Sequence, residues 1–293
     1  MSAARIHALT VDVEDYFQVT ALDGHLSRDA WATIPSRVAR STATVLEVLA
    51  RTGTRGTFFI LGWVAQHFPQ VVRDIDAAGH EIASHSFWHH QIYRQSASDF
   101  RDDVRRSRHV LEDLTGRRVQ FYRAPTFSIT TRSLWALDIL AEEGFTLDAS
   151  IFPIRHDRYG IPDAPRELHQ RPTKSGPIWE FPPTVARWGN ANLPVGGGGY
   201  FRLLPYAWTR MLWRRAEQQM TQPLMFYFHP WELDPEQPRV PGMSRLSAWR
   251  HRVNLHSMQQ KLERLLRDFR FGAIGDVLAA SAAHQSASTE VAA

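Results

Sequence analysis

Histidines crowd one short stretch of the sequence. The segment HEIASHSFWHH, residues 80–90, holds four of the 14 histidines in the 293-residue chain. His85 and His89 are four residues apart, so on a helical turn both would project from one face and could bind one cation as neutral imidazoles. The same spacing is also typical of a surface or hydrogen-bonded pair. The segment is not a zinc-protease HExxH motif, because Ser84 stands where the second histidine would be.

Acidic residues crowd the end of the first predicted strand. The segment TVDVEDYF contains Asp12, Glu14 and Asp15, and strand alternation places Asp12 and Glu14 on the same face. Three carboxylates this close repel one another unless a cation or an arginine lies nearby. A solvated acidic turn is the alternative interpretation.

Other polar residues take the same place after short apolar runs. Arg123 lies in YRAP, Asp148 in FTLDAS and His229 in FYFHPWE, each at the end of a predicted strand. A lone histidine at a strand end is commonly structural. The ends of parallel strands converge on one mouth in a barrel, however, so these side chains are expected to meet the histidine pair and the acidic turn.

Short β-like runs alternate with amphipathic helical stretches over most of the chain. This alternation predicts parallel strands joined by helices, either a (β/α) barrel or a doubly wound sheet. A long helix is expected from about Ser98 to Gly116, and further helices over 205–219 and 247–270. Residues 152–177 read as one long loop over the site, residues 194–205 as a flexible or tight-turning run, and 279–293 as a disordered tail.

Composition excludes several classes of site and partner. The chain has no cysteine, so thiolate metal sites, disulfides and cysteine nucleophiles are excluded. The net charge is +4, and all but two of the 34 basic residues are arginines scattered along the chain, which does not indicate a nucleic-acid partner. The N-terminal residues lack the apolar core of a signal peptide, so a cytoplasmic location is expected.

The motifs together resemble the polysaccharide deacetylases with NodB homology, carbohydrate esterase family four. HSFWH is similar to the family's histidine motif, TVDVED stands at its aspartate motif, YRAP at its arginine-proline motif and FYFHP at its late histidine motif. The resemblance implies an α/β fold, a distorted (β/α) barrel of about seven strands. It implies one domain over 1–278, with core motifs in 6–150 and 224–235 and family-specific loops and C-terminal helices in 151–278.

The resemblance also implies roles for individual residues. Asp12 would be the catalytic base and His229 the catalytic acid, while Arg123 would orient the base and Asp148 would hold that arginine. The metal ligands implied are His85 and His89, and a backbone N–H near Thr126 would bind the oxyanion. Trp88, Phe127 and Trp231 flank the motifs and could stack on sugar rings, but in a chain with ten tryptophans a place in the core is an equal alternative. Many members have adjacent aspartates, whereas here Val13 follows Asp12; members with Asp-x-Asp place the third ligand at the position of Glu14, with Asp15 as the alternative.

The function implied is removal of N-acetyl groups from an amino-sugar-containing poly- or oligosaccharide. The segments DVEDYF, SIFPI with RYGIP, and FHPWELDPEQPR resemble the branch associated with exosortase and exopolysaccharide clusters, which places this activity in exopolysaccharide biosynthesis. The implied cofactor is a divalent metal ion, with zinc the default for a His/His/carboxylate set. The expected partner is the carbohydrate substrate, with no nucleic acid and no stable membrane insertion. The alternatives are a barrel that hydrolyses another small amide or ureide, including one without metal, and a non-catalytic carbohydrate-binding barrel.

Overall fold

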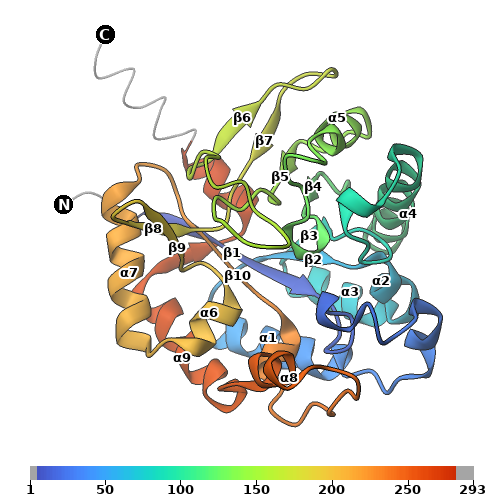
Figure 1. Cartoon of the computed structure of the whole chain (residues 1–293), viewed down its shortest axis with the longest axis horizontal. Helices are drawn as coiled ribbons and strands as arrows, with labels where there is room; N and C mark the ends of the chain where they lie inside the picture. Colours follow the sequence, from blue (N-terminus) through green and yellow to red (C-terminus); the bar gives the residue numbers. More distant parts are fainter. Residues whose placement is uncertain (1–4, 282–293) are drawn as a thin grey trace.

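The computed structural model, which describes residues 5–281, is built around one curled sheet (Figure 1). Its strand order is β10-β1-β2-β3-β4-β5-β7-β6, with β11 also paired to β1, and every pairing is parallel except that of β6 with β7. Strands β8 and β9 form a separate antiparallel hairpin. The strands are β1 (Ile6–Val13), β2 (Thr57–Ile60), β3 (Glu81–Ser84), β4 (Phe121–Tyr122), β5 (Leu147–Asp148), β6 (His169–Arg171), β7 (Ile178–Glu180), β8 (Val185–Trp188), β9 (Ala191–Pro194), β10 (Met225–Phe228) and β11 (Arg270–Gly272).

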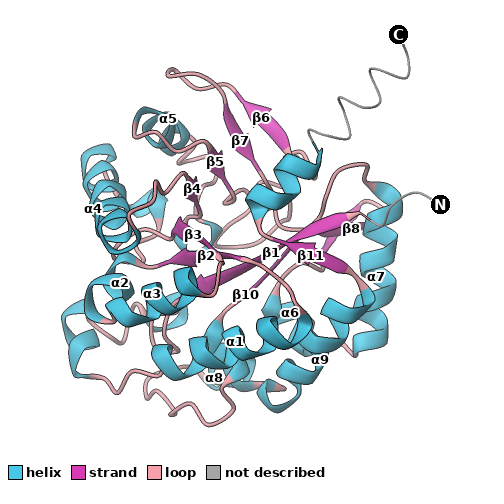
Figure 2. Cartoon of the chain, turned by 180° about the vertical axis from the view of Figure 1, so that it is seen from behind, coloured by secondary structure: helices cyan, strands magenta, loops and turns pink. Residues whose placement is uncertain are grey.

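Helices lie around the outside of the curled sheet, as Figures 1 and 2 show from opposite sides. Strands β1 to β5 are parallel neighbours joined by the helices between them, so the predicted distorted (β/α) barrel is confirmed, as a half-barrel of nine strands rather than about seven. The helices are α1 (Val38–Thr52), α2 (Gly62–His67), α3 (Pro69–Ala77), α4 (Ala97–Thr115), α5 (Trp135–Glu142), α6 (Gly198–Leu203), α7 (Tyr206–Gln219), α8 (Arg245–Arg252) and α9 (Leu255–Asp268), with 3-10 turns η1 (Thr20–Leu22), η2 (Arg28–Thr33), η3 (Ile92–Arg94), η4 (Pro125–Phe127) and η5 (Pro230–Leu233). In the described part of the chain, no helix has both the length and the apolar character to cross a bilayer.

The central strand β1 shows how the sequence aims side chains into the barrel. Leu9 and Val11 belong to the large core cluster that includes the helices, whereas Ala8 packs in an interior cluster with Phe59. Successive side chains of a strand point to opposite faces. Asp12 therefore shares the interior face with Ala8, and its carboxylate points into the barrel.

Helix α4 forms where the sequence predicts a long helix. The Ser96 side chain accepts a hydrogen bond from the Asp99 N–H, which caps the first turn. Gly116 ends the helix with φ 67°, a left-handed conformation that glycine adopts at low cost. Both ends of α4 are thus set by local sequence.

The second half of the chain departs more from the predictions. The expected loop 152–177 contains the edge strand β6, and the glycine-rich run 194–205 contains α6. The single helix expected over 247–270 is two helices, because the chain breaks at Asn254, whose φ is 55°. Residues 274–281 are helical, so the first three residues of the predicted disordered tail belong to a helix, while the remaining ones lie outside the described residues.

Candidate active site

The three predicted ligand residues meet at the carboxyl ends of β1 and β3. Glu14 directly follows β1, and His85 and His89 lie in the loop that follows β3. One possible ligand atom from each residue lies within 4.8 Å of the other two, and all three side chains are buried. The Nε2 atom of His89 is 2.8 Å from Oε2 of Glu14. Two imidazoles and one carboxylate are a ligand set typical of a catalytic metal site with an open coordination position.

The loop after β3 is not the helical turn that the histidine spacing predicts. Ser86 and His89 have φ values of 65° and 55°, which are uncommon for residues other than glycine. The Asp103 carboxylate of α4 accepts hydrogen bonds from the N–H groups of Phe87, at 2.5 Å, and Trp88, at 3.2 Å. The two imidazoles therefore converge because α4 holds the loop in a strained shape, and not because they share a helix face.

The ligand set has the protonation and the hydrogen bonding that suit a cation. His85 Nδ1 is 2.8 Å from the carbonyl oxygen of Arg123 and donates to it, which leaves a lone pair on Nε2. Burial lowers the pKa of His85 to about 4. Burial would raise the pKa of Glu14, but His89 and His229 outweigh it and hold the pKa at about 2. Oε2 of Glu14 is buried and, apart from the nearby Nε2 of His89, has no hydrogen-bond donor beside it in the described part of the chain, so these residues fit a divalent metal.

Asp15, the alternative carboxylate ligand, binds the start of α1 and not the histidines. Its carboxylate accepts hydrogen bonds from the Ser36 hydroxyl at 2.5 Å and from the N–H groups of Arg37 and Val38 at 2.9 and 3.2 Å. These groups form the start of α1, where an anion is favoured by the helix dipole. Asp15 therefore caps α1, and Glu14 is the carboxylate that faces the histidines.

Asp12 forms a buried ion pair beside the ligand set. The Arg123 guanidinium donates to Asp12 Oδ1 at 2.5 Å, and the two residues are 0% and 2% exposed. Arg123 also donates to the Thr10 hydroxyl at 3.0 Å and to the Ala149 carbonyl at 3.2 Å. The second oxygen of Asp12, Oδ2, faces Nε2 of His229 at 4.0 Å. The arginine thus fixes one carboxylate oxygen and leaves the other turned toward the histidine.

Asp148 does not hold Arg123, which corrects the role that the resemblance implies. Its Oδ1 accepts a hydrogen bond from the Ser150 hydroxyl at 2.5 Å, and its carboxyl pairs with that of Glu180 at the end of β7. Burial raises the pKa of both carboxyls, and Asp148 raises that of Glu180 further, to well above its ordinary value. These shifts favour the protonated form of the pair over the ionised form. The Ala149 carbonyl, and not the Asp148 carboxylate, accepts a hydrogen bond from Arg123.

His229 faces both carboxylates of the acidic turn from the end of β10. Its Nε2 is 3.7 Å from Glu14 Oε1, and its side chain is 20% exposed while those of Asp12 and Glu14 are 2% and 3% exposed. Its Nδ1 is 3.2 Å from Oε2 of Glu232, whose other oxygen accepts a hydrogen bond from Arg202 at 2.8 Å. Burial lowers the pKa of His229, but Glu14 and Glu232 raise it to about 9. His229 is therefore protonated at neutral pH.

The sequence predictions did not include Glu232 and Arg202, which hold His229 in place. The spacing of HPWE is a usable signal, because Glu232 returns from the third position of a 3-10 turn to the backbone N–H of His229 at 3.0 Å. Arg202 has no comparable signal, since it comes from α6, 30 residues earlier. The glycine-rich run has a role here, because a Cβ on Gly198 would overlap the Glu232 carboxylate.

Two of the predicted sugar platforms are buried. Trp231 is 5% exposed, its ring stacks with that of His229 at 5.1 Å, and its Nε1–H donates to Glu14 at 3.2 Å. Phe127 is 6% exposed and packs on Tyr227 with ring centroids 4.7 Å apart. Both rings are almost covered, so in this structure they take the alternative place in the core. Trp231 instead positions the Glu14 carboxylate.

Thr126 lies in the 3-10 turn that follows β4. It has a left-handed φ of 55°, as uncommon here as at the ligand loop. Its hydroxyl is hydrogen-bonded to that of Thr20, which ties this turn to the segment after β1. Donation from a backbone N–H near Thr126 to an oxyanion stays a prediction.

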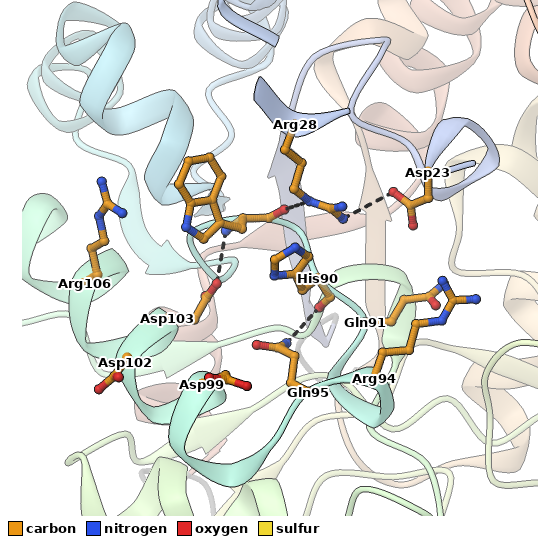
Figure 3. Close-up of a pocket in the computed structure, with 11 residues that line it drawn as sticks. Asp23, Arg28, His90, Gln91, Arg94, Gln95, Asp99, Asp102, Asp103 and Arg106 are labelled. Atoms are coloured by element: carbon orange, nitrogen blue, oxygen red, sulfur yellow. Dashed lines mark hydrogen bonds and ion pairs between the residues drawn. The ribbon is translucent and has the colours of Figure 1, made fainter. Parts of the chain in front are cut away.

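The third predicted platform, Trp88, lines a pocket of about 550 Å³ beside the ligand loop (Figure 3). Arg28 shapes this pocket, because it donates to the carbonyls of Trp88 at 2.6 Å and His89 at 3.0 Å and pairs with Asp23 at 3.3 Å. Gln91 also lines the pocket and is 2% exposed. Neither amide atom of Gln91 has a hydrogen-bond partner among the residues described. A polar ligand in this pocket would satisfy them.

Two family models divide the chain just after β5. Residues 28–146 match the family described as "Polysaccharide deacetylase", and residues 149–279 match a "Domain of unknown function (DUF3473)". The chain carries a polysaccharide deacetylase domain. The acidic turn with Asp12 and Glu14 precedes the first match, and His229 lies in the second. The site of this deacetylase domain is therefore assembled from both matched regions and from the strand before them.

Individual relatives agree with this family. Over 98 residues the chain is 30% identical to a peptidoglycan-N-acetylglucosamine deacetylase of Bacillus cereus, covering 33% of this chain and 36% of that protein. A chitooligosaccharide deacetylase of Bradyrhizobium is 28% identical over 101 residues, which cover 34% of this chain and 43% of the relative. The chain thus spans less than half the length of these relatives. A crystal structure assigned to the polysaccharide deacetylases, from Mycobacterium smegmatis, has the same fold, with a TM-score of 0.64 and 18% identity over 97% of this chain and 93% of the other.

Proposed function

We propose that this protein is a metal-dependent deacetylase that removes N-acetyl groups from amino sugars in a poly- or oligosaccharide. One observation carries the proposal: a His/His/Glu ligand set, an arginine-paired carboxylate and a protonated histidine face one another at one end of the barrel. The relatives named as deacetylases of peptidoglycan N-acetylglucosamine and of chitooligosaccharides support the same reaction class.

The acidic turn and the histidine loop promote the first step, in which water attacks the acetamide carbonyl. A divalent cation held by Glu14, His85 and His89 would polarise the acetamide carbonyl and lower the pKa of a water molecule. Asp12 takes the proton of the attacking water at Oδ2, because Oδ1 is held by Arg123. Arg123 holds this carboxylate in a buried ion pair and aims it inside the barrel.

His229 promotes the second step, which is release of the sugar amine. When the new C–O bond has formed and the C–N bond breaks, Nε2 of His229 donates its proton to the leaving nitrogen, giving acetate and a free amino sugar. Glu232 binds Nδ1 of the same ring and so fixes its orientation. The side chain of His229 is the most exposed of the proposed catalytic groups, as contact with substrate requires.

The pocket beside the ligand loop suits a sugar next to the one that is deacetylated. Trp88 offers an aromatic face there, and Gln91 offers an unpaired amide group. This pocket favours an oligomer over a monosaccharide as substrate. A role in exopolysaccharide biosynthesis is also proposed, and it rests on the sequence resemblance alone.

The decisive experiment measures acetate released from an N-acetylglucosamine tetramer and from the monosaccharide. Protein stripped of metal by a chelator should release no acetate, zinc should restore the release, and the tetramer should react faster than the monosaccharide. Equal release before and after chelation would contradict the metal-dependent reaction. Hydrolysis of a small non-sugar amide or ureide in place of the sugar would favour the rival hydrolase. Binding of the tetramer without acetate release would favour a carbohydrate-binding barrel.

A further inference from the structure

Helix α7 has an outer face with large apolar side chains in solvent. Trp208 and Met211, three residues apart on the helix, are 59% and 45% exposed. Trp188 is 52% exposed on the hairpin strand β8, which packs against α7. Figures 1 and 2 both place α7 and the hairpin at the rim of the molecule, away from the middle of the sheet. Exposed apolar residues that gather in this way indicate an interaction surface.

Arginines surround these apolar side chains. Trp188 and Met211 line a surface pocket of about 800 Å³ together with charged residues of α7 and α9, which are Arg210, Arg214, Arg215, Arg264, Arg267 and Asp268. Two of the five arginines pair with carboxylates of α9. Within the described part of the chain, Arg214, Arg215 and Arg264 form no ion pair with a carboxylate. Arg215 lies over the Trp188 ring at 4.8 Å and Arg264 over the Tyr206 ring at 5.2 Å.

We propose that this surface docks on an anionic lipid bilayer. We call it the α7 face and define it by Trp188, Trp208, Met211, Arg214, Arg215 and Arg264. A helix with arginines beside exposed tryptophan and methionine matches the two requirements of interfacial binding, which are charge attraction to lipid phosphates and insertion of apolar side chains below the headgroups. The proposal stands independently of the deacetylase activity.

A lipid surface explains the α7 face better than a nucleic acid does. A nucleic-acid duplex is held chiefly by its phosphates, so the arginines would be sufficient and the exposed Met211 would add little binding free energy. A bilayer uses both kinds of side chain. The α7 face therefore predicts binding that depends on lipid charge and on apolar side chains together.

Docking by this face would hold the barrel close to the membrane. Two residues separate the end of α6 from the start of α7, and α6 carries Arg202, which binds Glu232 beneath His229. The docking element is thus directly connected to the support of the proposed catalytic acid. A saccharide attached to a lipid carrier would be presented at the same surface.

The test uses the full chain and vesicles of phosphatidylcholine, with and without 30% phosphatidylglycerol, in a co-sedimentation assay. At about 0.1 M salt we expect binding to the anionic vesicles to be at least tenfold tighter than to neutral ones. Raising the salt to about 0.5 M, which shortens the range of the charge attraction, should weaken binding about tenfold. Equal binding to neutral and anionic vesicles, or no binding to either, would overturn the proposal.

Variants separate the α7 face from general basic charge. The double variants Arg214→Gln/Arg215→Gln and Trp208→Ala/Met211→Ser should each weaken binding to anionic vesicles at least fivefold. The matched controls are Arg73→Gln/Arg132→Gln, which removes equal charge from other exposed positions, and Trp179→Ala, which removes a 36% exposed ring on β7. Both controls should bind like wild type. Equal losses in the controls would contradict the proposal, as would tight binding to a single-stranded oligonucleotide that is insensitive to Trp208→Ala/Met211→Ser and unaccompanied by vesicle binding.

Discussion

Two pairs of carboxyl groups lie buried at strand ends of the same barrel, yet their surroundings differ. Asp12 is in the last two residues of β1 and Glu14 follows it, while Asp148 and Glu180 end β5 and β7, and all four residues are at most 2% exposed. The first pair has nitrogen-bearing partners, with the Arg123 guanidinium 2.5 Å from Asp12 and the His89 imidazole 2.8 Å from Glu14. Asp148 and Glu180 form no ion pair in the described part of the chain, and burial raises the pKa of both.

The difference shows what makes a buried carboxyl group useful for chemistry. Burial by itself disfavours the charged form, as the raised pKa of Glu180 illustrates. A cation beside the carboxyl group allows the charge to persist, which a base or a metal ligand requires. Asp148 and Glu180 instead act structurally, because Asp148 binds Ser150 and Glu180 accepts the Ile151 N–H at 3.0 Å. Identical residue types at equivalent strand ends thus have opposite roles.

The largest effect should come from Asp12→Asn. Loss of the base should reduce the rate of deacetylation by about 10²- to 10⁴-fold, while bound zinc remains, because Asp12 is not in the ligand set. Acetate release and zinc content, measured on the same sample, check this prediction. Asp148→Asn is the matched control, since it makes the same change at an equally buried strand end.

The control variant should keep its rate within a few-fold of wild type. A loss for Asp148→Asn as large as that for Asp12→Asn would show that both pairs belong to the catalytic machinery. That result would restore the role of Asp148 that the resemblance implies. It would also contradict the distinction between a catalytic pair and a structural pair of carboxyl groups.

Arg123→Met should cause the largest loss of stability. Removing one partner of a buried ion pair leaves the other charge unpaired, which lowers the free energy of unfolding by about 3–5 kcal/mol. The double variant Arg123→Met/Asp12→Asn should regain part of this loss, because no charge is stranded. Urea denaturation measures both values, with Arg40→Met as a control at an exposed pair worth about 1 kcal/mol or less. Equal destabilisation by the single and double variants would contradict the charge argument.

Replacing Glu14 or Glu180 by glutamine should affect the bound metal differently in the two carboxyl pairs. Glu14→Gln removes the only carboxylate in the ligand set of the described residues and should lose most of the bound zinc. Glu180→Gln replaces a carboxyl group whose pKa is raised well above its ordinary value, so its zinc content should match wild type and its stability should change by about 1 kcal/mol or less. Elemental analysis after gel filtration measures the metal. Loss of zinc from both variants would argue that the effect is structural.

The smallest effect should appear in the pH dependence of stability. The pKa of Glu180 is raised in the folded protein above 4.5, so between 4.5 and the folded pKa the folded state holds a proton that the unfolded state has lost. The free energy of unfolding contributed by this group therefore falls as pH rises through that interval. Wild type should lose stability relative to Glu180→Gln over that range, and parallel pH curves for the two proteins would refute the raised pKa.

Much of the site follows from the sequence because strand ends converge. Asp12, Glu14, His85, Arg123 and His229 each follow a short apolar run, and parallel strands bring such positions to one edge of the sheet. The chain order of the motifs identified the deacetylase resemblance, which the spacing of the two histidines could not do by itself. The convergence of these residues could therefore be predicted without coordinates.

Other features depend on contacts between distant segments, which no local pattern encodes. Arg202 reaches Glu232 only because α6 packs against the turn after β10, and the choice of Glu14 over Asp15 depends on where α1 begins. The burial of Trp231 and the exposure of Trp88 likewise reflect tertiary packing, since both are tryptophans beside a motif. The histidine loop brings its two predicted ligand residues together with a backbone other than the predicted helical turn, because Asp103 of α4 holds the loop in place.

Anomalous diffraction from crystals grown with zinc tests the central claim most directly. The account predicts a single strong peak among Glu14, His85 and His89, about 2.0–2.2 Å from one atom of each, with Asp12 held by Arg123 and not bound to the metal. A peak on Asp15, a peak at Asp148 and Glu180, or no peak within reach of the two histidines would contradict it.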